Sequence, residues 1–525
     1  MSTRTISLPL VLAAFAVTTA CTGDPTESNS GFGDPDGAES SSTGGPSDEP
    51  TDTNGGSTGS TTSAPSDLGT TSGEEEESTG TPTGLARIRL VHAAAGAPNL
   101  DVYFAGSEAA VITDLAYGGA SDYADMPAGS LAFEIRAAGT PAGDPPVYVG
   151  AFELDDESTV TAVAAGIVDS ADEANAFRVL SLVEEFEDPG EGNAAIRFVN
   201  AGADATEISI DVDHDGAGPE LSHVDRFADS GAAGVPLQAD AAVQLGIITE
   251  GEELTAFTSP ALAEGGHVFL IAAGMRDDLP RQVTGLGLLA VGPDGVIGMI
   301  RQNPIFYSLH ASPDSGRFDV CIDGIARAVG HGFGEIVRIQ LPPGGYDLEY
   351  FSQGSECDGE PENMQASGEL VAGEQYLMVS AGEIVPENGD QLFHMTPFVE
   401  AFPLDEGSDA VFSVIHAGSA PPVDFGTLDD GHELTPETLL VADLEWGEQS
   451  EIMMLPANQY DVGFVPASVP LPAAPYGVVP APMDQGTRAW MIAAGAVTPQ
   501  GYDYVATVFT VVTSSNPWVV VPLDD

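Results

Sequence analysis

One strand-like segment recurs four times in this 525-residue chain and ends each time in His or Asn, which we call the anchor residue. Successive anchor residues are 108, 110 and 106 positions apart. The segments and their continuations read "RLVHAAAGAPNLDVYFAG" (89–106), "RFVNAGADATEISIDVDHDG" (197–216), "YSLHASPDSGRFDVCIDG" (307–324) and "FSVIHAGSAPPVDFGTLDDG" (412–431), with anchors His92, Asn200, His310 and His416. A period of this length matches one small globular domain, so we expect four similar domains in tandem.

Two further markers follow each anchor in the same order. A turn followed by alternating apolar residues occupies 126–135, 235–245, 341–351 and 455–464. An apolar segment that ends in two small residues and a Gly occupies 159–166, 267–274, 375–382 and 488–495. Three markers in one order, four times over, indicate one repeated folding unit.

The apolar pattern inside each repeat favours β-strands. In "LDVYF", Leu100, Val102 and Phe104 share one face of a strand, while Asp101 and Tyr103 share the other. The segment "FDVCI" (318–322) alternates in the same way, which is typical of a half-buried antiparallel strand. The 62 Gly and 39 Pro residues supply many turns between such strands.

We therefore predict an all-β protein with four tandem antiparallel β-sandwich domains of Ig-like or Greek-key type, each with about seven strands. The predicted domains cover 85–190, 191–302, 303–403 and 404–525. The acidic segment 169–188 has a helical look, and we interpret it as a loop followed by the last strand of the first domain.

The first 84 residues predict export, anchoring and a tether. Residues 1–21 hold one positive charge, Arg4, then a short apolar run and the small residues before Cys21, which resemble a lipoprotein signal with its lipobox Cys. An ordinary secretory signal cut near Ala20 is the alternative. Residues 22–84 are an acidic Ser/Thr/Gly/Pro linker with almost no large apolar residue, so we expect them to be disordered.

Cysteine usage fits an exported protein. Of the three Cys, lipidation of Cys21 leaves Cys321 and Cys357, which can form one disulfide in an oxidising compartment. We expect Cys321 on the outer face of its strand and Cys357 in a following loop, so that the bond staples the third repeat.

The charge of the chain limits its partners. The formal net charge is −67, and all 14 basic residues are Arg. Such a field repels nucleic acid, so no nucleic-acid partner is expected.

The stretch "IDVDHDG" (210–216) is the candidate metal site of the chain. Asp211, Asp213 and Asp215 alternate as in the first half of a calcium loop, but Ser222 stands where the closing Glu should be. Aligned with the other repeats, Asp211 falls beside Asp101 and Asp319, and Asp215-Gly216 beside the Asp-Gly pair at 323–324. We therefore expect a tight hairpin turn, with a weak metal site as the alternative.

The segment "HASPDSGRFDV" (310–320) resembles the signature of a bacterial surface family, domain of unknown function 4397. The copies at 92–102, 200–212 and 416–425 keep parts of the same frame. The resemblance implies tandem β-sandwich domains on exported proteins and brings no assigned activity.

No catalytic motif or cofactor site is found in the sequence, and we expect the anchor His residues to hydrogen-bond their neighbouring turns. The expected function is therefore that of a non-catalytic protein, lipid-anchored in the bacterial envelope at the outer membrane or cell surface. It would serve adhesion, scaffolding or binding of an envelope protein or surface polysaccharide. A carbohydrate- or cation-dependent binding module is the alternative, and an enzyme is the least expected class.

Overall fold

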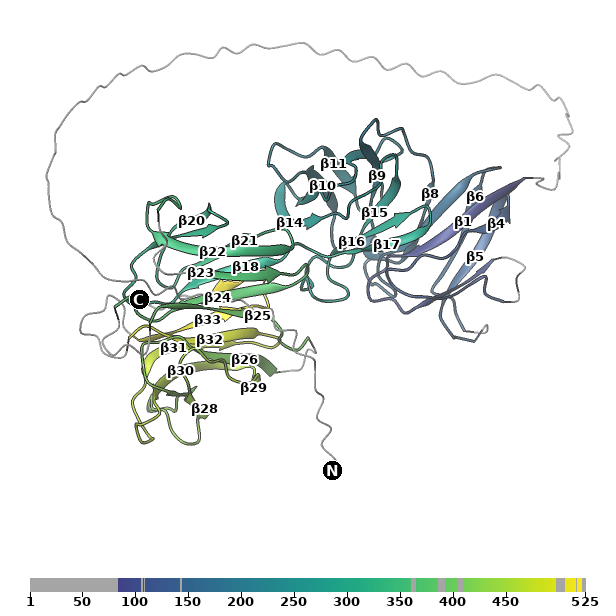
Figure 1. Ribbon diagram of the computed structural model, residues 1–525. Coiled ribbons are helices and arrows are strands. Elements are labelled where there is room, and N and C mark those ends of the chain that lie inside the picture. The colour runs from purple at the N-terminus through teal and green to yellow at the C-terminus, as the bar shows by residue number, and fades with distance from the viewer. Residues whose placement is uncertain are drawn as a thin grey trace, which may run out of the picture. The chain divides into compact units, whose positions relative to one another are not determined.

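The computed structural model describes residues 84–104, 107, 109–141, 144–359, 365–385, 392–404, 409–496, 506–515 and 517–521. The predicted signal, the lipidation residue Cys21 and the linker up to residue 83 lie outside these ranges. In the described part of the chain, eight β-sheets form four pairs, each built from consecutive strands (Figure 1). The prediction of an all-β, tandem β-sandwich architecture is confirmed.

Unit 1 pairs a sheet in the order β4-β1-β7-β8 with a sheet in the order β3-β2-β5-β6. Its elements are β1 (Leu85–His92), β2 (Leu100–Phe104), β3 (Ile112–Leu115), β4 (Ala124–Pro127), β5 (Gly129–Ala137), β6 (Tyr148–Leu154), β7 (Thr159–Ala165), the 3-10 turn η1 (Glu173–Asn175) and β8 (Arg178–Val183). The segment 169–188 is thus a loop and a last strand, as predicted.

Unit 2 pairs the sheets β12-β9-β15-β16-β17 and β11-β10-β13-β14. Its strands are β9 (Asn193–Asn200), β10 (Glu207–Val212), β11 (Leu221–Asp225), β12 (Val235–Gln238), β13 (Gln244–Thr249), β14 (Glu252–Thr258), β15 (His267–Ala273), β16 (Gly287–Gly292) and β17 (Gly295–Ile300). The fifth strand of the first sheet, β17, has no counterpart among the described residues of unit 1.

Unit 3 pairs the sheets β21-β18-β24-β25 and β20-β19-β22-β23. Its strands are β18 (Ile305–His310), β19 (Phe318–Ile322), β20 (Ile325–His331), β21 (Ile336–Gln340), β22 (Gly344–Ser352), β23 (Gln365–Leu370), β24 (Gln375–Ala381) and β25 (His394–Val399).

Unit 4 pairs the sheets β29-β26-β32-β33-β34 and β28-β27-β30-β31. Its strands are β26 (Asp409–His416), β27 (Val423–Thr427), β28 (Leu439–Leu444), β29 (Met453–Pro456), β30 (Asn458–Pro466), β31 (Tyr476–Met483), β32 (Arg488–Ala494), β33 (Thr507–Val512) and β34 (Val519–Val520). The described units therefore hold eight or nine strands each, rather than seven.

We call the sheet that contains the anchor residue the anchor sheet and its mate the outer sheet. At the centre of each anchor sheet, the anchor strand pairs in parallel with the strand of the third marker: β1 with β7, β9 with β15, β18 with β24 and β26 with β32. This departs from the predicted antiparallel pairing, because the chain crosses to the outer sheet and back between the two strands. Parallel strands are usually covered on both faces, which fits their nearly unbroken apolar sequences.

The core of each unit lies between its two sheets. In β2, Leu100, Val102 and Phe104 are buried, and the residues between them are half-buried, as the alternation predicted. In the matching strand β19, all five residues are buried, so the expectation of a half-exposed strand is wrong there. The difference arises because a disulfide-bonded loop covers the outer face of β19.

The Gly of the third marker has a positive φ in all four units. Gly166, Gly274, Gly382 and Gly495 all have φ between +74° and +100°. At Gly274, an added Cβ would lie 2.6 Å from the carbonyl oxygens of Thr284 and Gly285, so the turn and the returning chain leave no room for a side chain.

We predict that Gly274→Ala destabilises unit 2 far more than Gly265→Ala does. Gly265 also has a positive φ, +70°, but an added Cβ there would meet nothing within 4 Å. The control substitution therefore costs only the backbone strain of about 1 kcal/mol. Thermal unfolding followed by calorimetry should show the larger loss for Gly274→Ala, and equal losses would contradict the steric argument.

Candidate functional site

The anchor His residues hold the turns that follow them. His92, His310 and His416 are fully buried. The Nε2–H group of each donates to a carbonyl oxygen five or six residues later: Pro98 at 3.1 Å, Gly316 at 2.6 Å and Pro421 at 3.1 Å, respectively. Burial lowers the pKa of all three, to about 4 for His310 and His416. They are therefore neutral near pH 7, and their predicted structural role is confirmed.

Asn200 holds the corresponding turn of unit 2 by hydrogen bonds, without a titratable group. Its amide nitrogen donates to the carbonyl oxygens of Ala205 at 3.3 Å and Val224 at 3.2 Å. Its side-chain oxygen accepts the N–H of Gly202 at 3.3 Å. The anchor position thus needs a compact side chain that both donates and accepts.

Replacement of His416 by Asn should remove one source of pH dependence. The unfolded chain binds a proton at this His below about pH 6.5, while burial lowers the folded-state pKa to about 4. The stabilising contribution is therefore complete above pH 6.5 and is lost as the pH falls toward 4. Between pH 7 and pH 4, wild type should lose about 3 kcal/mol of unfolding free energy that His416→Asn does not lose.

Urea titrations followed by Trp fluorescence can measure this difference, because the three Trp of the chain, at 446, 490 and 518, all belong to unit 4. The exposed His432→Asn substitution is the matched control within the same unit. Identical pH profiles for wild type and His416→Asn would contradict the prediction.

The Asp of the motif His-Ala-Ser-Pro-Asp fixes a second turn. Asp314 accepts the N–H groups of Ile384 at 2.8 Å and Val385 at 3.2 Å, just beyond the third-marker Gly. In unit 2, Asp204 stands four residues after the anchor, as Asp314 does, and accepts the N–H of Arg276 at 2.9 Å. The motif therefore joins two turns at the same end of a unit.

An acceptor side chain clamps a β-bulge in every outer sheet. Each acceptor lies on the first strand of the sheet and accepts the N–H of a residue with positive φ on the neighbouring strand or turn. The four pairs are Asp101 with Asp114 (2.8 Å), Ser209 with His223 (3.0 Å), Asp319 with Gly330 (2.8 Å) and Asp424 with Asp443 (2.9 Å). The counterpart of Asp101 and Asp319 in unit 2 is therefore Ser209, and the predicted alignment with Asp211 is wrong by two residues.

The tight hairpin predicted at Asp215-Gly216 is also wrong. β10 ends at Val212 and β11 begins at Leu221, so a longer loop joins them. In unit 3, by contrast, Asp323 and Gly324 alone join β19 to β20, with φ of +50° and +73°. In unit 2, residues 213–220 join the two strands, so the connection is a loop rather than a two-residue turn.

Two of the candidate metal ligands, Asp211 and Asp215, accept hydrogen bonds from the backbone of this loop. Asp211 is buried, and its Oδ2 accepts the N–H of Gly216 at 3.0 Å. Asp215 Oδ1 accepts the N–H of Ala217 at 2.8 Å. Asp213 has a φ of +66°. In the described part of the chain, no group of three or more His, Cys, Asp or Glu residues could hold a metal ion.

The structure joins Cys321 and Cys357 by a disulfide, with the Cα atoms 6.0 Å apart. Cys321 lies on the outer face of β19, as expected, but it is fully buried beneath the loop that carries Cys357. Asp319, two residues before Cys321, accepts the N–H groups of Gly354 and Glu356 from the same loop, at 2.8 and 3.3 Å.

Thiol titration of the unfolded, unreduced protein should find neither of these two thiols free. Reduction should destabilise unit 3 by up to about 4 kcal/mol, because the bond closes a loop with a sequence separation of 36 residues. The Cys321→Ser/Cys357→Ser double variant is the control, since reductant should leave its stability unchanged. Two reactive thiols in the unreduced wild type would exclude the bond.

The sequence markers missed one further turn, which recurs in each unit and carries aromatic contacts to the neighbouring unit in units 3 and 4. Gly118, Phe227, Gly334 and Gly447 all have positive φ and donate their N–H to the carbonyl oxygen of the anchor residue, at 2.7–2.8 Å. Two aromatic residues that directly precede these glycines contact the neighbouring unit. Phe333 packs on Phe509 of unit 4 with the ring centroids 5.2 Å apart, and Trp446 packs on His394 of unit 3 with the ring centroids 4.3 Å apart. The recurring aromatic-Gly pair was the available signal in units 1, 3 and 4.

Units 1 and 2 pack together through their anchor sheets. Val91, Val163 and Leu182 of unit 1 share one buried cluster with Phe269, Ile271 and Leu289 of unit 2. Two equivalent arginines, each three residues before its anchor, cross the interface in opposite directions. Arg89 donates to Gly292 O and Arg197 donates to Val183 O, both at 2.6 Å. The two units are therefore related by approximate two-fold symmetry.

Units 3 and 4 pack in the same way with different chemistry. Tyr307 and Ser413 take the two arginine positions, and the shared cluster includes Leu377, Ile492 and Trp490. Tyr307 stacks on Trp518 at 4.2 Å between ring centroids. Aromatic burial thus replaces the charged contacts of the first pair.

A buried ion pair links units 2 and 3. Arg281 binds Glu400, which is completely buried, and its Nη2 lies 3.0 Å from Glu400 Oε1. Nearby, Gln340 of unit 3 donates to Thr255 Oγ1 at 2.8 Å and accepts the N–H of Ala256 at 3.1 Å. These polar contacts fix the junction between the two pairs of units.

Arg281→Gln should destabilise this junction by about 3–5 kcal/mol, because it leaves the buried carboxylate of Glu400 without its partner. Calorimetry can measure the loss, and the Arg281→Met/Glu400→Leu double variant should recover most of it. Arg276→Gln removes an exposed pair with Asp277 in the same unit and should cost about 1 kcal/mol or less. Equal effects of the Arg276 and Arg281 variants would contradict the role of burial.

Ser308 and His331 form a buried pair of the residue types that serve elsewhere as nucleophile and general base. Ser308 Oγ lies 3.3 Å from His331 Nε2 and 2.7 Å from Tyr350 Oη. All three side chains are buried, and burial lowers the pKa of His331 to about 3. The group is thus a hydrogen-bonded part of the unit 3 core.

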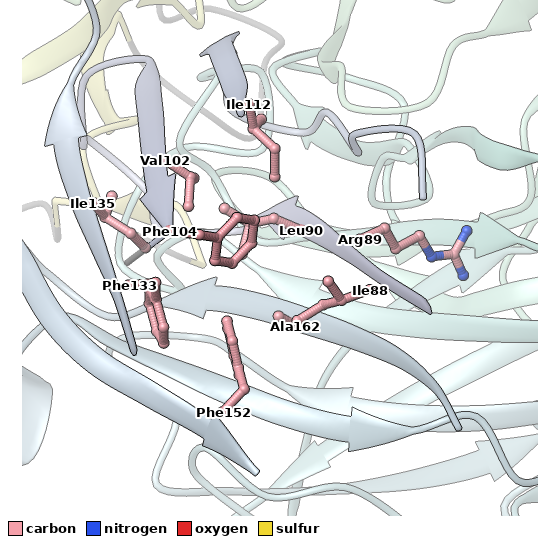
Figure 2. Close-up of a pocket in the computed structure, with 10 residues that line it drawn as sticks. All are labelled: Ile88, Arg89, Leu90, Val102, Phe104, Ile112, Phe133, Ile135, Phe152 and Ala162. Atoms are coloured by element: carbon pink, nitrogen blue, oxygen red, sulfur yellow. The ribbon is translucent and has the colours of Figure 1, made fainter. Parts of the chain in front are cut away.

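Two cavities are lined by residues of unit 1. Figure 2 shows apolar side chains from both sheets of unit 1 converging on a core space, with Arg89 pointing away from it. The volume of this space is about 10 Å³. Such a space holds at most a single water molecule. A cleft of about 580 Å³ opens where unit 1 meets unit 2, and it is lined by residues of both.

The fold and these contacts define the class as a tandem β-sandwich protein. A family model described as domain of unknown function (DUF4397) matches residues 86–211, which confirms the resemblance for unit 1 and the start of unit 2. No curated protein matches the chain. A solved structure, "The Bacillus anthracis TIE protein", is 7% identical over 79% of this chain and 68% of that chain, with a TM-score of 0.12, which supports no conclusion.

Proposed function

We propose that this is a non-catalytic protein of the bacterial envelope, lipid-anchored through Cys21, that presents paired β-sandwich units for adhesion, scaffolding or partner binding. The observation that carries the proposal is the role of the recurrent polar residues. Anchor residues, motif Asp residues and bulge clamps hydrogen-bond within their own units, so the repeated chemistry builds the scaffold.

The contacts between units support a presenting role. Buried apolar clusters join units 1 and 2 and units 3 and 4, and a buried ion pair joins units 2 and 3. Such interfaces suit a protein that holds binding surfaces at fixed spacings along one chain. Among the described residues, no helix is long and apolar enough to span a membrane.

A carbohydrate- or cation-dependent binding module is the second candidate. The cleft between units 1 and 2 favours it, because a polar cleft of about 580 Å³ is large enough for a small ligand. The cation-dependent form has less support, because Asp211 and Asp215 accept backbone N–H groups of their own loop.

Fractionation and crosslinking on intact cells test the proposal. Wild type should fractionate with membranes and carry a lipid on Cys21, and the Cys21→Ala variant should lose both properties. Crosslinking should recover a stoichiometric envelope partner with wild type and with the Arg276→Gln control. Membrane retention of Cys21→Ala would refute the anchor, and turnover of an ester, peptide or glycoside library, abolished by one substitution, would refute the non-catalytic assignment.

A further inference from the structure

Strand β8 is an open edge of the anchor sheet of unit 1, because the sheet order β4-β1-β7-β8 gives it a neighbour on one side only. At the end of the ladder between β7 and β8, the N–H of Glu184 donates to Thr159 O at 2.7 Å. Hydrogen-bonded pairs alternate along an antiparallel ladder, so every second residue of β8 turns its backbone groups away from β7. These residues are Val179, Ser181 and Val183.

Most of the outward backbone groups have no partner in the part of the chain that the structure describes. The C=O of Val183 has two, since it accepts Arg197 Nη1 at 2.6 Å and the N–H of Glu185 at 2.9 Å. The N–H of Val183 and both backbone groups of Val179 and Ser181 form no hydrogen bond there. Ser181 and Val183 are also exposed, so a further strand has access to this edge.

The other three anchor sheets protect the same edge. The strand registers make Ala290, Pro397 and Thr510 the counterparts of Ser181. In unit 2, Ala290 pairs with the fifth strand β17, and in unit 4, Thr510 O accepts the N–H of Val521, just beyond β34, at 2.9 Å. In unit 3, Pro397 has no N–H to donate, which blocks the pairing of a further strand. Among the four described anchor sheets, that of unit 1 has neither device.

The fifth strand of unit 2 shows which side chain such a strand needs. Met299 of β17 packs in the cluster shared with unit 1, and a Cβ added at Gly287 would lie 2.9 Å from its Sδ. Gly287 thus leaves room for an apolar side chain. Its counterpart in unit 1 is Arg178, whose guanidinium carbon lies 4.2 Å from the ring centroid of Phe227 of unit 2. A strand beside β8 therefore meets a guanidinium where β17 meets a glycine.

Arg178 is placed to receive a carboxylate. Its Nε donates to Ala176 O at 3.2 Å and its Nη2 to Glu173 O at 2.9 Å, and both acceptors are neutral backbone groups. Within the described ranges, Arg178 forms no ion pair and its Nη1 donates to no acceptor. A carboxylate on the added strand, at the position that Met299 has in β17, would complete it with a charge-assisted hydrogen bond.

We propose that the edge of β8 binds an extended segment of a partner protein as an antiparallel fifth strand. The segment hydrogen-bonds the backbone of Val179 and Ser181, carries apolar or small residues as β17 does, and places an Asp or Glu beside Arg178. A second copy of this chain is a poorer occupant, because two chains of net charge −67 repel each other. The inference rests on the proposed function and deepens it by naming one binding edge and the chemistry of its partner.

The probe is the peptide acetyl-Lys-Lys-Gly-Val-Ile-Gly-Glu-Ile-amide, which has the sequence of β17 with Glu at the position of Met299 and two Lys for solubility. Calorimetric titration of the purified full chain should show one equivalent bound with a Kd below about 1 mM. Exchange of the peptide's Glu for Gln should weaken binding about 10-fold, as should Arg178→Gln, and the two changes together should weaken it no further. Non-specific attraction to the acidic chain predicts the opposite, because the Gln peptide is more positive.

Ser181→Pro tests the backbone pairing. Pro397 stands at the equivalent position of unit 3, so the substitution suits the fold, and it should weaken binding at least 10-fold by removing an outward N–H. Ser181→Ala is the matched control, because it keeps the backbone groups and should leave the affinity within about two-fold. N-methylation of the peptide's second Gly, the counterpart of Gly298 opposite Ser181, removes the matching donor from the ligand and should weaken binding equally, whatever the stability of the protein variant.

Equal thermal midpoints must show that Ser181→Pro and Arg178→Gln are folded. Absence of binding by wild type, or binding that survives Ser181→Pro and N-methylation, would overturn the proposal. A dimer of the chain in light scattering that Ser181→Pro dissociates would replace the partner by a second copy and overturn the occupant. Loss of this site with membrane anchoring through Cys21 and envelope crosslinks intact would leave the proposed function standing.

Discussion

The burial of each anchor sheet on both faces is the constraint on which the rest of the structure depends. In β7, Val160, Ala162 and Ala164 pack into the core of unit 1, while Val163 and Ala165 pack against unit 2. A sheet with two apolar faces cannot be left exposed on one of them without a large hydrophobic cost. Each unit therefore needs a neighbour, and the chain supplies one by repeating the unit.

Double burial also explains the polar residues of the repeats. A strand covered on both faces must satisfy its ends and turns without water, because an unpaired buried polar group costs about 1–3 kcal/mol. The anchor residue, the motif Asp and the bulge clamp each accept or donate to a backbone group at such a place. The recurrent polar residues of this chain are therefore mainly partners for backbone hydrogen bonds.

The two pairs of units show that the same geometry tolerates different chemistry. Arg89 and Arg197 bridge the first pair, whereas Tyr307 and Trp518 stack in the second. The charged contacts between units 1 and 2 leave polar groups close to solvent at the edge of the interface. The cleft lined by Arg87 lies at this edge. In the second pair, aromatic rings pack in the interface instead, so the two pairs differ in the chemistry of their contacts.

The sequence by itself determined the number of repeats, their β-structure and the buried role of the anchor His residues, and it predicted the pairing of Cys321 with Cys357. These properties are written in local patterns: period-two alternation in 100–104, the recurring His or Asn, and the small-small-Gly turns. The aromatic-Gly turn was also present in the sequence, but its importance shows only when its contacts across units are seen.

Only the tertiary structure decided which residues are equivalent and which meet. Ser209, not Asp211, takes the place of Asp101, because the residue type differs at this position and the hydrogen bond to the bulged strand identifies the equivalent side chain. The parallel pairing of β1 with β7, the reciprocal arginines and the ion pair of Arg281 with Glu400 join residues up to 203 positions apart. Such contacts depend on how whole sheets stack, since a hydrophobic pattern specifies that a face is buried but not what covers it.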